Sequence, residues 1–254
     1  MSAQPETSIL TVLPRGRHAA PRPVVREAQR VRMLGAMVQA VAEKGYAKVT
    51  VADVIERAGV SRKTFYEQFA NKEDCFLAAY DATVDDLLVT IDDALDALAP
   101  DWLAAHRAAV EAYLQTLAAS PEFAKALLIE VLGAGPEALE RRAAVQDRFA
   151  NQLKDVHRRA RQDIPEIPEV PPHTYRAAVG AVNELVTAHV LEHGADTLPE
   201  LADAILDVQL ALLVGREVAH DLATATADAT ADATAAAATD AATTANADAG
   251  ASTT

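Results

Sequence analysis

The chain has 254 residues, 50% of them hydrophobic, and a formal net charge of −14. It can therefore bury a substantial core in one or two domains, and its acidity disfavours indiscriminate binding to polyanions. No apolar run approaches the roughly 20 residues that span a bilayer, and the N-terminus lacks the hydrophobic region of a signal peptide, so we expect a cytoplasmic protein without membrane contact.

The first predicted element is a basic arm. Residues 1–72 contain 12 Lys and Arg against 6 Asp and Glu, a net charge of +6, whereas residues 73–254 contain 11 against 31, a net charge of −20. Prolines in the sequence PRGRHAAPRPVVR (14–26) oppose regular structure. We assign residues 1–25 to a flexible arm, which is either a disordered linker or a segment that follows the phosphates or the minor groove of DNA.

A helix is predicted from about Arg26 to Lys44, with Gly45 placed to end it. Its apolar residues form one stripe: Val31, Leu34, Val38 and Val41. Thr50 and Asp53 then have the spacing of a capping box ahead of a short helix over residues 51–58. This first part of the chain is therefore built from helices with well-defined ends.

Gly59 and Ser61 give the next segment the spacing of a helix-turn-helix motif. Gly59 allows a tight turn, and Ser61 caps a second short helix that runs to about Phe69. Phe65 and Phe69 are four residues apart and must pack inward. The opposite face is polar: Arg62, Lys63 and Tyr66, with Thr64 at its edge. Because the second helix of such a motif enters the major groove, we expect this face to contact DNA, the alternative being a solvated charged surface.

Residues 73–220 are predicted to form a helical bundle. Its helices are expected at about 71–98, 102–118, 120–132, 136–162, 173–192 and 198–214, with the proline-rich segment 164–172 as a stiff connector. Glu137 with Arg141, and Asp155 with Arg159, have the spacing of ion pairs within one helix. Thr197 and Glu200 have the spacing of a second capping box.

The last two helices carry apolar side chains over much of their surface and need covering from two sides. Two stripes are candidates for a subunit interface, the alternative being an ordinary monomer core: Val179, Val182, Val186 and Val190 on the first helix, and Leu201, Ile205, Val208 and Leu212 on the second. After these helices the chain becomes a low-complexity sequence of Ala, Thr and Asp. We expect this tail, residues 221–254, to be disordered and dispensable for DNA binding.

Residues 40–81 closely resemble the DNA-binding domain of TetR-family transcriptional regulators. The resemblance rests on EKGY, on AGVSRKTFYEQF and on NKED, and it covers about 50 residues. It implies an all-α protein of about nine helices, in which a three-helix DNA-binding domain (26–72) precedes a ligand-binding and dimerisation domain. It also implies a DNA interface: phosphate contacts from Thr50, Tyr66 and Lys72, and base or backbone contacts from Arg62, Lys63 and Thr64, next to the cap Ser61.

The resemblance further implies a homodimer on a palindromic operator, with the last two helices of each subunit forming a four-helix bundle. Repression is the commonest outcome in the family, and a small-molecule effector that enters the bundle releases the DNA. Large side chains in the middle of the bundle are candidates for its pocket, although core packing is the better explanation for any one of them: Trp102, His106, Tyr113, Phe123 and Phe149.

Other chemistry has little support in the sequence. His189 and His193 have metal-ligand spacing but no evident third ligand, so we expect neither a metal nor a cofactor. Cys75 excludes an intrachain disulfide and is either a buried apolar residue or a redox-sensitive thiol. No phosphate loop or nucleophile motif indicates an enzyme. A helical adaptor that uses the motif for protein contact is the alternative function.

Overall fold

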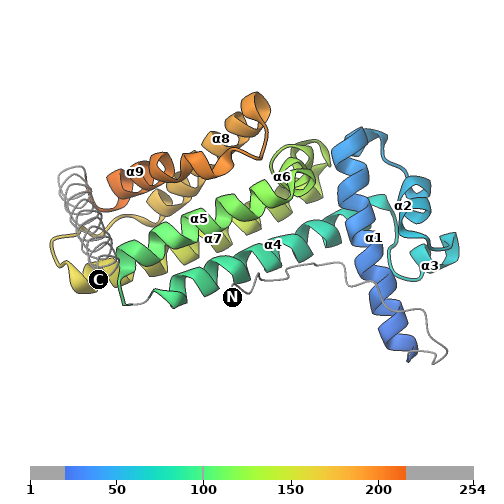
Figure 1. Cartoon of the computed structure of the whole chain (residues 1–254), viewed down its shortest axis with the longest axis horizontal. Helices are drawn as coiled ribbons and strands as arrows, with labels where there is room; N and C mark the ends of the chain where they lie inside the picture. Colours follow the sequence, from blue (N-terminus) through green and yellow to red (C-terminus); the bar gives the residue numbers. More distant parts are fainter. Residues whose placement is uncertain (1–20, 99, 216–254) are drawn as a thin grey trace, which may run out of the picture.

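The computed structural model describes residues 21–98 and 100–215, and these residues form helices only (Figure 1). The elements in chain order are α1 (Arg22–Lys44), η1 (Tyr46–Lys48), α2 (Val51–Ala58), α3 (Arg62–Tyr66), α4 (Lys72–Ala97), α5 (Trp102–Ala119), α6 (Pro121–Leu128), η2 (Glu130–Gly133), α7 (Pro136–Asp163), α8 (Pro172–His193), η3 (Leu198–Leu201) and α9 (Ala202–Leu213). The predicted all-α class is confirmed. Within the described ranges, no helix is long and apolar enough to cross a membrane.

The first helix begins earlier than the sequence pattern predicted. α1 starts at Arg22, so residues 22–25 belong to a helix and not to the extended arm. Proline is compatible with the first turn of a helix, where no amide needs an intrahelical acceptor, and Pro23 lies in that turn. The remaining arm residues, 1–20, and the predicted tail, 221–254, lie outside the described residues.

The helix-turn-helix has the predicted caps. The Asp53 amide donates to Thr50 Oγ1 at 3.3 Å, and the Thr50 amide donates to Asp53 Oδ2 at 2.8 Å, which completes the capping box. Gly59 adopts the left-handed conformation with φ of 62°. α3 ends at Tyr66 and not near Phe69, and Asn71, in an extended conformation, then caps α4.

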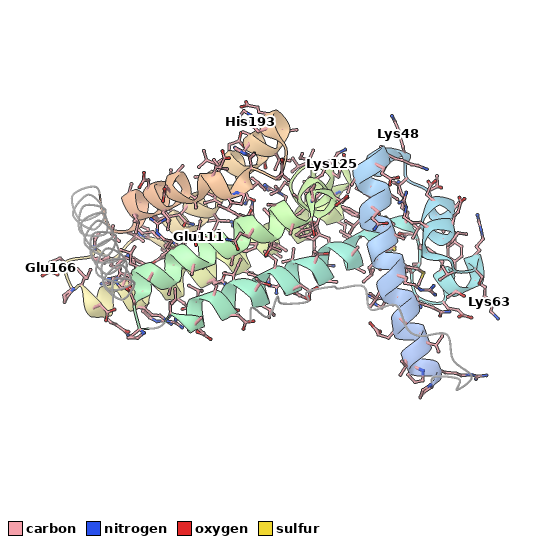
Figure 2. The ribbon with its side chains drawn as sticks, viewed as in Figure 1. Lys48, Lys63, Glu111, Lys125, Glu166 and His193 are labelled. Carbon is pink, nitrogen blue, oxygen red and sulfur yellow. The ribbon has the colours of Figure 1, made fainter. Side chains whose placement is uncertain are left out.

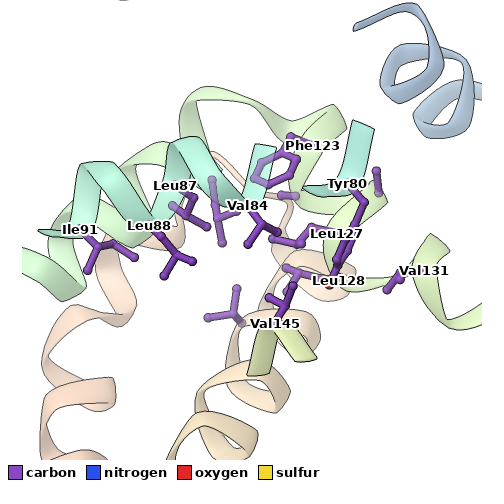
Figure 3. Packing of buried hydrophobic residues seen from close by; sticks show 14 of the residues in the cluster. Tyr80, Val84, Leu87, Leu88, Ile91, Phe123, Leu127, Leu128, Val131 and Val145 are labelled. Carbon is purple, nitrogen blue, oxygen red and sulfur yellow. The ribbon is translucent and has the colours of Figure 1, made fainter. Parts of the chain in front are cut away.

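The second part of the chain is a bundle of long helices (Figure 1). α4, α5 and α7 run along its length, and α8 and α9 lie side by side over one face. Its core is continuous with that of the N-terminal domain. Figure 3 shows part of this core, where α4 supplies Val84 and Leu87 and α6 supplies Leu127 and Leu128. Two helices of the bundle, α4 and α6, both pack against α1 and so hold it in place.

Ion pairs join α4 to α7 in place of the pairs predicted within α7. Arg141 binds Asp81, and Arg148 Nη2 lies 2.7 Å from Asp85 Oδ1. Arg159 Nη2 lies 4.0 Å from Asp96 Oδ1. The predicted pairing of Arg141 with Glu137 and of Arg159 with Asp155 was wrong, because the acidic face of α4 lies alongside the arginines of α7.

Two helix ends in the bundle also differ from prediction. α6 ends at Leu128, and a 3-10 turn follows to Gly133, where the sequence pattern predicted one continuous helix. Thr197 makes no side-chain cap to η3. Its hydroxyl lies instead 2.8 Å from His189 Nε2, so the second capping box was wrong.

Candidate nucleic-acid interface and ligand cavity

The short helix α3 presents a basic and phenolic face to solvent. Phe65 is fully buried and Phe69 is almost so, with their ring centroids 5.5 Å apart. On the opposite side, Arg62, Lys63 and Tyr66 are exposed, and Figure 2 shows the Lys63 side chain projecting beyond the ribbon of α3. The predicted division between an inner and an outer face is therefore confirmed.

The segment that carries this face is fixed against α1 by polar contacts. Arg26 Nη2 donates to the Glu67 carbonyl at 3.3 Å, and Gln68 Nε2 donates to the Arg26 carbonyl at 3.2 Å. The Arg30 guanidinium lies 4.9 Å from the centre of the Phe69 ring, within the range of a cation–π interaction. α3 is therefore presented by a rigid support and not by a loose loop.

The hydroxyl groups of the predicted DNA interface lie at the starts of α2 and α3. Thr50 Oγ1 donates to the Asp53 carboxylate at 2.8 Å. The Lys44 ammonium, with help from Thr50, lowers the pKa of Asp53 to about 2. Ser61 Oγ and Thr64 Oγ1 are 2.9 Å apart, and either can donate to the other. Because only one of these two hydrogens is used, the pair retains one donor for a phosphate oxygen.

Lys72 opens α4 as predicted and contacts Tyr46 within its own chain. Its Nζ donates to the Tyr46 carbonyl at 2.9 Å and lies 4.2 Å from the centre of the Tyr46 ring. Tyr46 offers the ammonium group both a carbonyl oxygen and an aromatic face, so Lys72 is engaged within its own chain. The predicted contact of this ammonium group with a DNA phosphate stays a prediction.

Tyr46 also links the N-terminal domain to the bundle, a role that sequence reasoning missed. Its amide donates to Glu130 Oε2 at 2.7 Å, and its ring centroid lies 4.8 Å from that of Phe76. Lys125 Nζ donates to the Ala42 carbonyl, also at 2.7 Å. More than 80 residues separate each of these polar pairs in sequence, so no local pattern indicates them.

Lys48 is a second residue that the sequence reasoning missed. It lies in η1, two residues before the cap Thr50, and its side chain is exposed (Figure 2). The available signal was its position, because this lysine closely precedes a helix start that is predicted to face DNA. It adds a cation to the same domain that carries Arg62 and Lys63.

A cavity lies inside the bundle between α4, α5, α7, α8 and α9. Its volume is about 640 Å³, including the mouth that opens to solvent. Most of its lining is apolar, and the polar lining residues are His106, Tyr113, Gln152, Asn183 and Gln209. A mostly apolar cavity with few polar groups suits a small organic molecule.

Residues 34–79, which run from α1 through the helix-turn-helix into α4, match the family model described as bacterial regulatory proteins, tetR family. The N-terminal domain belongs to the TetR family. A curated relative, the HTH-type transcriptional regulator EthR of Mycolicibacterium smegmatis, is 31% identical over 132 residues. That alignment covers 52% of this chain and 59% of the relative, so it spans less than two thirds of that protein.

Solved structures extend the likeness of fold beyond the TetR-family domain. The fatty acid degradation regulator FadR of Bacillus halodurans matches with a TM-score of 0.65 and 23% identity, over 72% of this chain and 94% of that chain. FadR of Bacillus subtilis, solved in complex with stearoyl-CoA, matches with a TM-score of 0.64 and 21% identity, over 73% and 98%. The bundle behind the TetR-family domain therefore has the fold of these regulators.

Three of the five predicted pocket residues line the cavity behind the TetR-family domain: His106, Tyr113 and Phe149. Burial raises the pKa of the Tyr113 phenol. Trp102 and Phe123 are buried but do not line it. Trp102 begins α5, and Figure 3 shows Phe123 near Val84 and Leu127. For these two residues core packing was the better interpretation.

The predicted interface stripes are partly wrong. Val179, Val182 and Ile205 line the cavity, and Val186 is fully buried within its own chain. The buried side chains of Val179, Val186 and Ile205 are therefore unavailable to a second subunit, whereas Val182 is half-buried. Three more lie half-buried, namely Val190, Leu201 and Val208, and Leu212 is exposed. The stripe was misassigned because both faces of α8 and α9 are apolar, and spacing alone does not say which face meets the chain's own core.

The remaining candidates show no sign of separate chemistry. The rings of His189 and His193 lie 4.9 Å apart, but the described residues contain no group of three metal-ligand side chains. Cys75 is buried, and burial raises the pKa of its thiol to about 12, which keeps it protonated at neutral pH. Of the two interpretations of Cys75, the buried apolar residue agrees with this environment.

Proposed function

We propose that this protein is a sequence-specific DNA-binding transcriptional regulator and not an enzyme. In this proposal a homodimer binds a palindromic operator as a repressor, and a small molecule in the bundle cavity releases it. The observation that carries the proposal is the exposed face of α3, where Arg62, Lys63 and Tyr66 point to solvent while Phe65 anchors the helix from behind.

Charge and rigidity both support contact with the major groove. A cation in the first turn of a helix opposes the helix dipole, so Arg62 and Lys63 lie where they do nothing for the helix itself. Guanidinium and ammonium groups suit guanine edges and phosphates. The contacts of Arg26 and Gln68 keep this face in a fixed orientation.

A homodimer is supported by the outer face of α8 and α9. This face, which we call the α8/α9 face, consists largely of small and aliphatic residues, with the exposed Glu184 among them: Ala177, Gly180, Ala181, Ala188 and Leu191 on α8, and Ala204, Val208, Ala211 and Leu212 on α9. Leu191 is 67% exposed. Small residues allow close approach of a second copy, and two-fold symmetry would double the contacts that one short helix makes with DNA.

Regulation by a ligand is supported by the contacts between the bundle and α1. Lys125 belongs to α6 and Glu130 follows that helix, and both accept or donate hydrogen bonds with backbone groups at the C-terminal end of α1. A ligand that binds one arrangement of the bundle better than the other shifts α1, and with it α3. The complex of FadR with stearoyl-CoA supports ligand binding by a protein of this fold.

Selection of bound sites from random duplexes tests the proposal. We expect a near-palindromic site whose affinity falls steeply with salt. Arg62→Ala should weaken binding by about 1–3 kcal/mol and relax specificity at one position per half-site. Arg158→Ala, a change of an exposed arginine in α7, is the matched control. Affinity indifferent to duplex sequence would contradict the regulator and favour the adaptor.

A further inference from the structure

The cavity contains two buried polar atoms without a partner. His106 Nε2, from α5, and Gln209 Oε1, from α9, make no hydrogen bond of ordinary geometry with a described residue, although the Gln209 side chain lies close enough to His106 to raise its pKa as a hydrogen-bond partner does. The side chains are 5% and 8% exposed, and both residues line the cavity. Buried polar groups in folded proteins nearly always have a partner, because leaving one unpaired destabilises the fold. These two atoms are therefore candidates for contact with a ligand.

The rest of the lining carries no compensating charge. None of the fifteen described residues that line the cavity is Asp, Glu, Lys or Arg. Burial lowers the pKa of His106 to about 4, although the Gln209 side chain beside it favours the charged form, so the imidazole is neutral at pH 7. An ionised group brought into this cavity loses its hydration and finds no opposite charge.

The hydrogen-bonding capacity of the two atoms defines the polar end of the ligand. Gln209 Oε1 can only accept, so the ligand must donate to it. His106 Nε2 donates or accepts according to its tautomer. A hydroxyl group can donate to Gln209 and accept from His106, and an amide can do the same with its N–H and its carbonyl.

We propose that the cavity binds an uncharged, largely apolar molecule whose single polar end carries an O–H or N–H group for Gln209 and His106. This inference gives the chemical class of the effector and rests on the proposed function only for its regulatory meaning. Aromatic and aliphatic side chains, such as Phe149 and Val179, would cover the apolar body of the molecule.

Calorimetric titration of the full chain without DNA tests the ligand class. Two matched series serve as probes: decanol, decanoate and decylammonium, and biphenylmethanol with the corresponding carboxylate and ammonium. In at least one series we expect the alcohol to bind about tenfold or more tightly than either ion. Equal or tighter binding of an ion, tighter binding of decanoyl-CoA, or no binding in either series would overturn the proposal.

A variant at Gln209 tests the polar contact. Gln209→Met should weaken binding of the alcohol about fivefold or more, and it should raise the melting temperature of the ligand-free protein because it removes an unpaired buried atom. Gln115→Met is the control, since Gln115 is an exposed residue of α5 that does not line the cavity. We expect this control to leave the affinity within about twofold.

The opposite result at Gln209, a lower melting temperature with unchanged affinity, would assign its amide a structural role and refute the proposal. The outcomes also separate this inference from the proposed function. A chain that binds the alcohol but no duplex would refute the regulator alone. A chain that binds a specific duplex but neither alcohol would refute the ligand class alone.

Discussion

The carboxylate of Glu130 accepts a hydrogen bond from the backbone amide of Tyr46 at 2.7 Å, which ties the segment after α6 to the end of α1. Gly45, just before that amide, has φ of 76°, and a Cβ at that position would lie 3.4 Å from the same carboxylate. The chain therefore approaches Glu130 closely at a residue whose backbone conformation favours glycine.

Removing this bond should weaken both the fold and the response to ligand. We expect Glu130→Ala to lower the free energy of unfolding by about 1–3 kcal/mol, because it leaves the Tyr46 amide without its charged partner. Ligand affinity should not change, whereas the ligand should release DNA less effectively. Thermal unfolding and DNA-release titrations measure the two effects. Glu137→Ala, an exposed carboxylate at the start of α7, is the control and should change neither.

We expect Lys72 to contribute to stability and Lys63 to contribute to DNA binding. Lys72→Met removes a hydrogen bond and a cation–π contact with Tyr46, so we expect a loss of about 1–2 kcal/mol of stability. Lys63 has an 87% exposed side chain, so Lys63→Met should leave stability within about 0.5 kcal/mol. It should reduce the dependence of log affinity on log salt by about 1. An unchanged melting temperature for Lys72→Met would show that this contact contributes nothing to the fold.

Truncation of the Phe65 ring, on the buried side of α3, should destabilise the N-terminal domain. Phe65 is fully buried between α3 and the core, and Phe65→Ala removes its packing and leaves a cavity. We expect a loss of about 3–5 kcal/mol, measured by denaturant titration. Tyr66→Ala, at an adjacent but 51% exposed position, should change stability little. Equal losses for the two variants would contradict the assigned inner and outer faces.

His106 should make stability depend on pH. Its pKa is near 6.5 in an unfolded chain and about 4 in the folded protein, so the unfolded state binds more protons between these values. The free energy of unfolding should therefore fall as pH is lowered from 6.5 to 4, by roughly 3 kcal/mol from this residue. The difference between wild type and His106→Leu isolates this contribution. A difference that does not change across that window would show that His106 titrates normally.

A charge on the α8/α9 face should disrupt the proposed dimer. Ala211→Glu changes an exposed helical position to another good helix former, so the subunit should stay folded. Light scattering should detect a shift from dimer to monomer, and operator affinity should fall with it. Val89→Glu, on the exposed face of α4, is the matched control. A dimer that survives Ala211→Glu would place the interface elsewhere.

Local patterns predicted most of the fold because the signals were themselves local. The Thr50–Asp53 box, the Gly59 turn and the pairing of Phe65 with Phe69 each depend on residues within a few positions of one another. Arg22 joined α1 against expectation, because proline opposes a helix interior but not its first turn.

The site was predictable only where one helix decides which way a side chain points. The outer face of α3 follows from its own spacing, whereas the positions of Val179 and Ile205 depend on how α8 and α9 pack against the rest of the bundle. The contacts of Glu130 and Lys125 with α1 join segments far apart in the chain. No periodicity in a single sequence records such pairings.

The lack of formal charge around the cavity also limits how a signal reaches this protein. Molecules that lose little free energy on entering such a lining are those that also partition into hydrocarbon, and they diffuse through lipid bilayers without a carrier. A compound of this kind reaches both sides of a cell envelope without a transporter. On the proposed ligand class, occupancy of the cavity would therefore follow the concentration of the compound outside the cell.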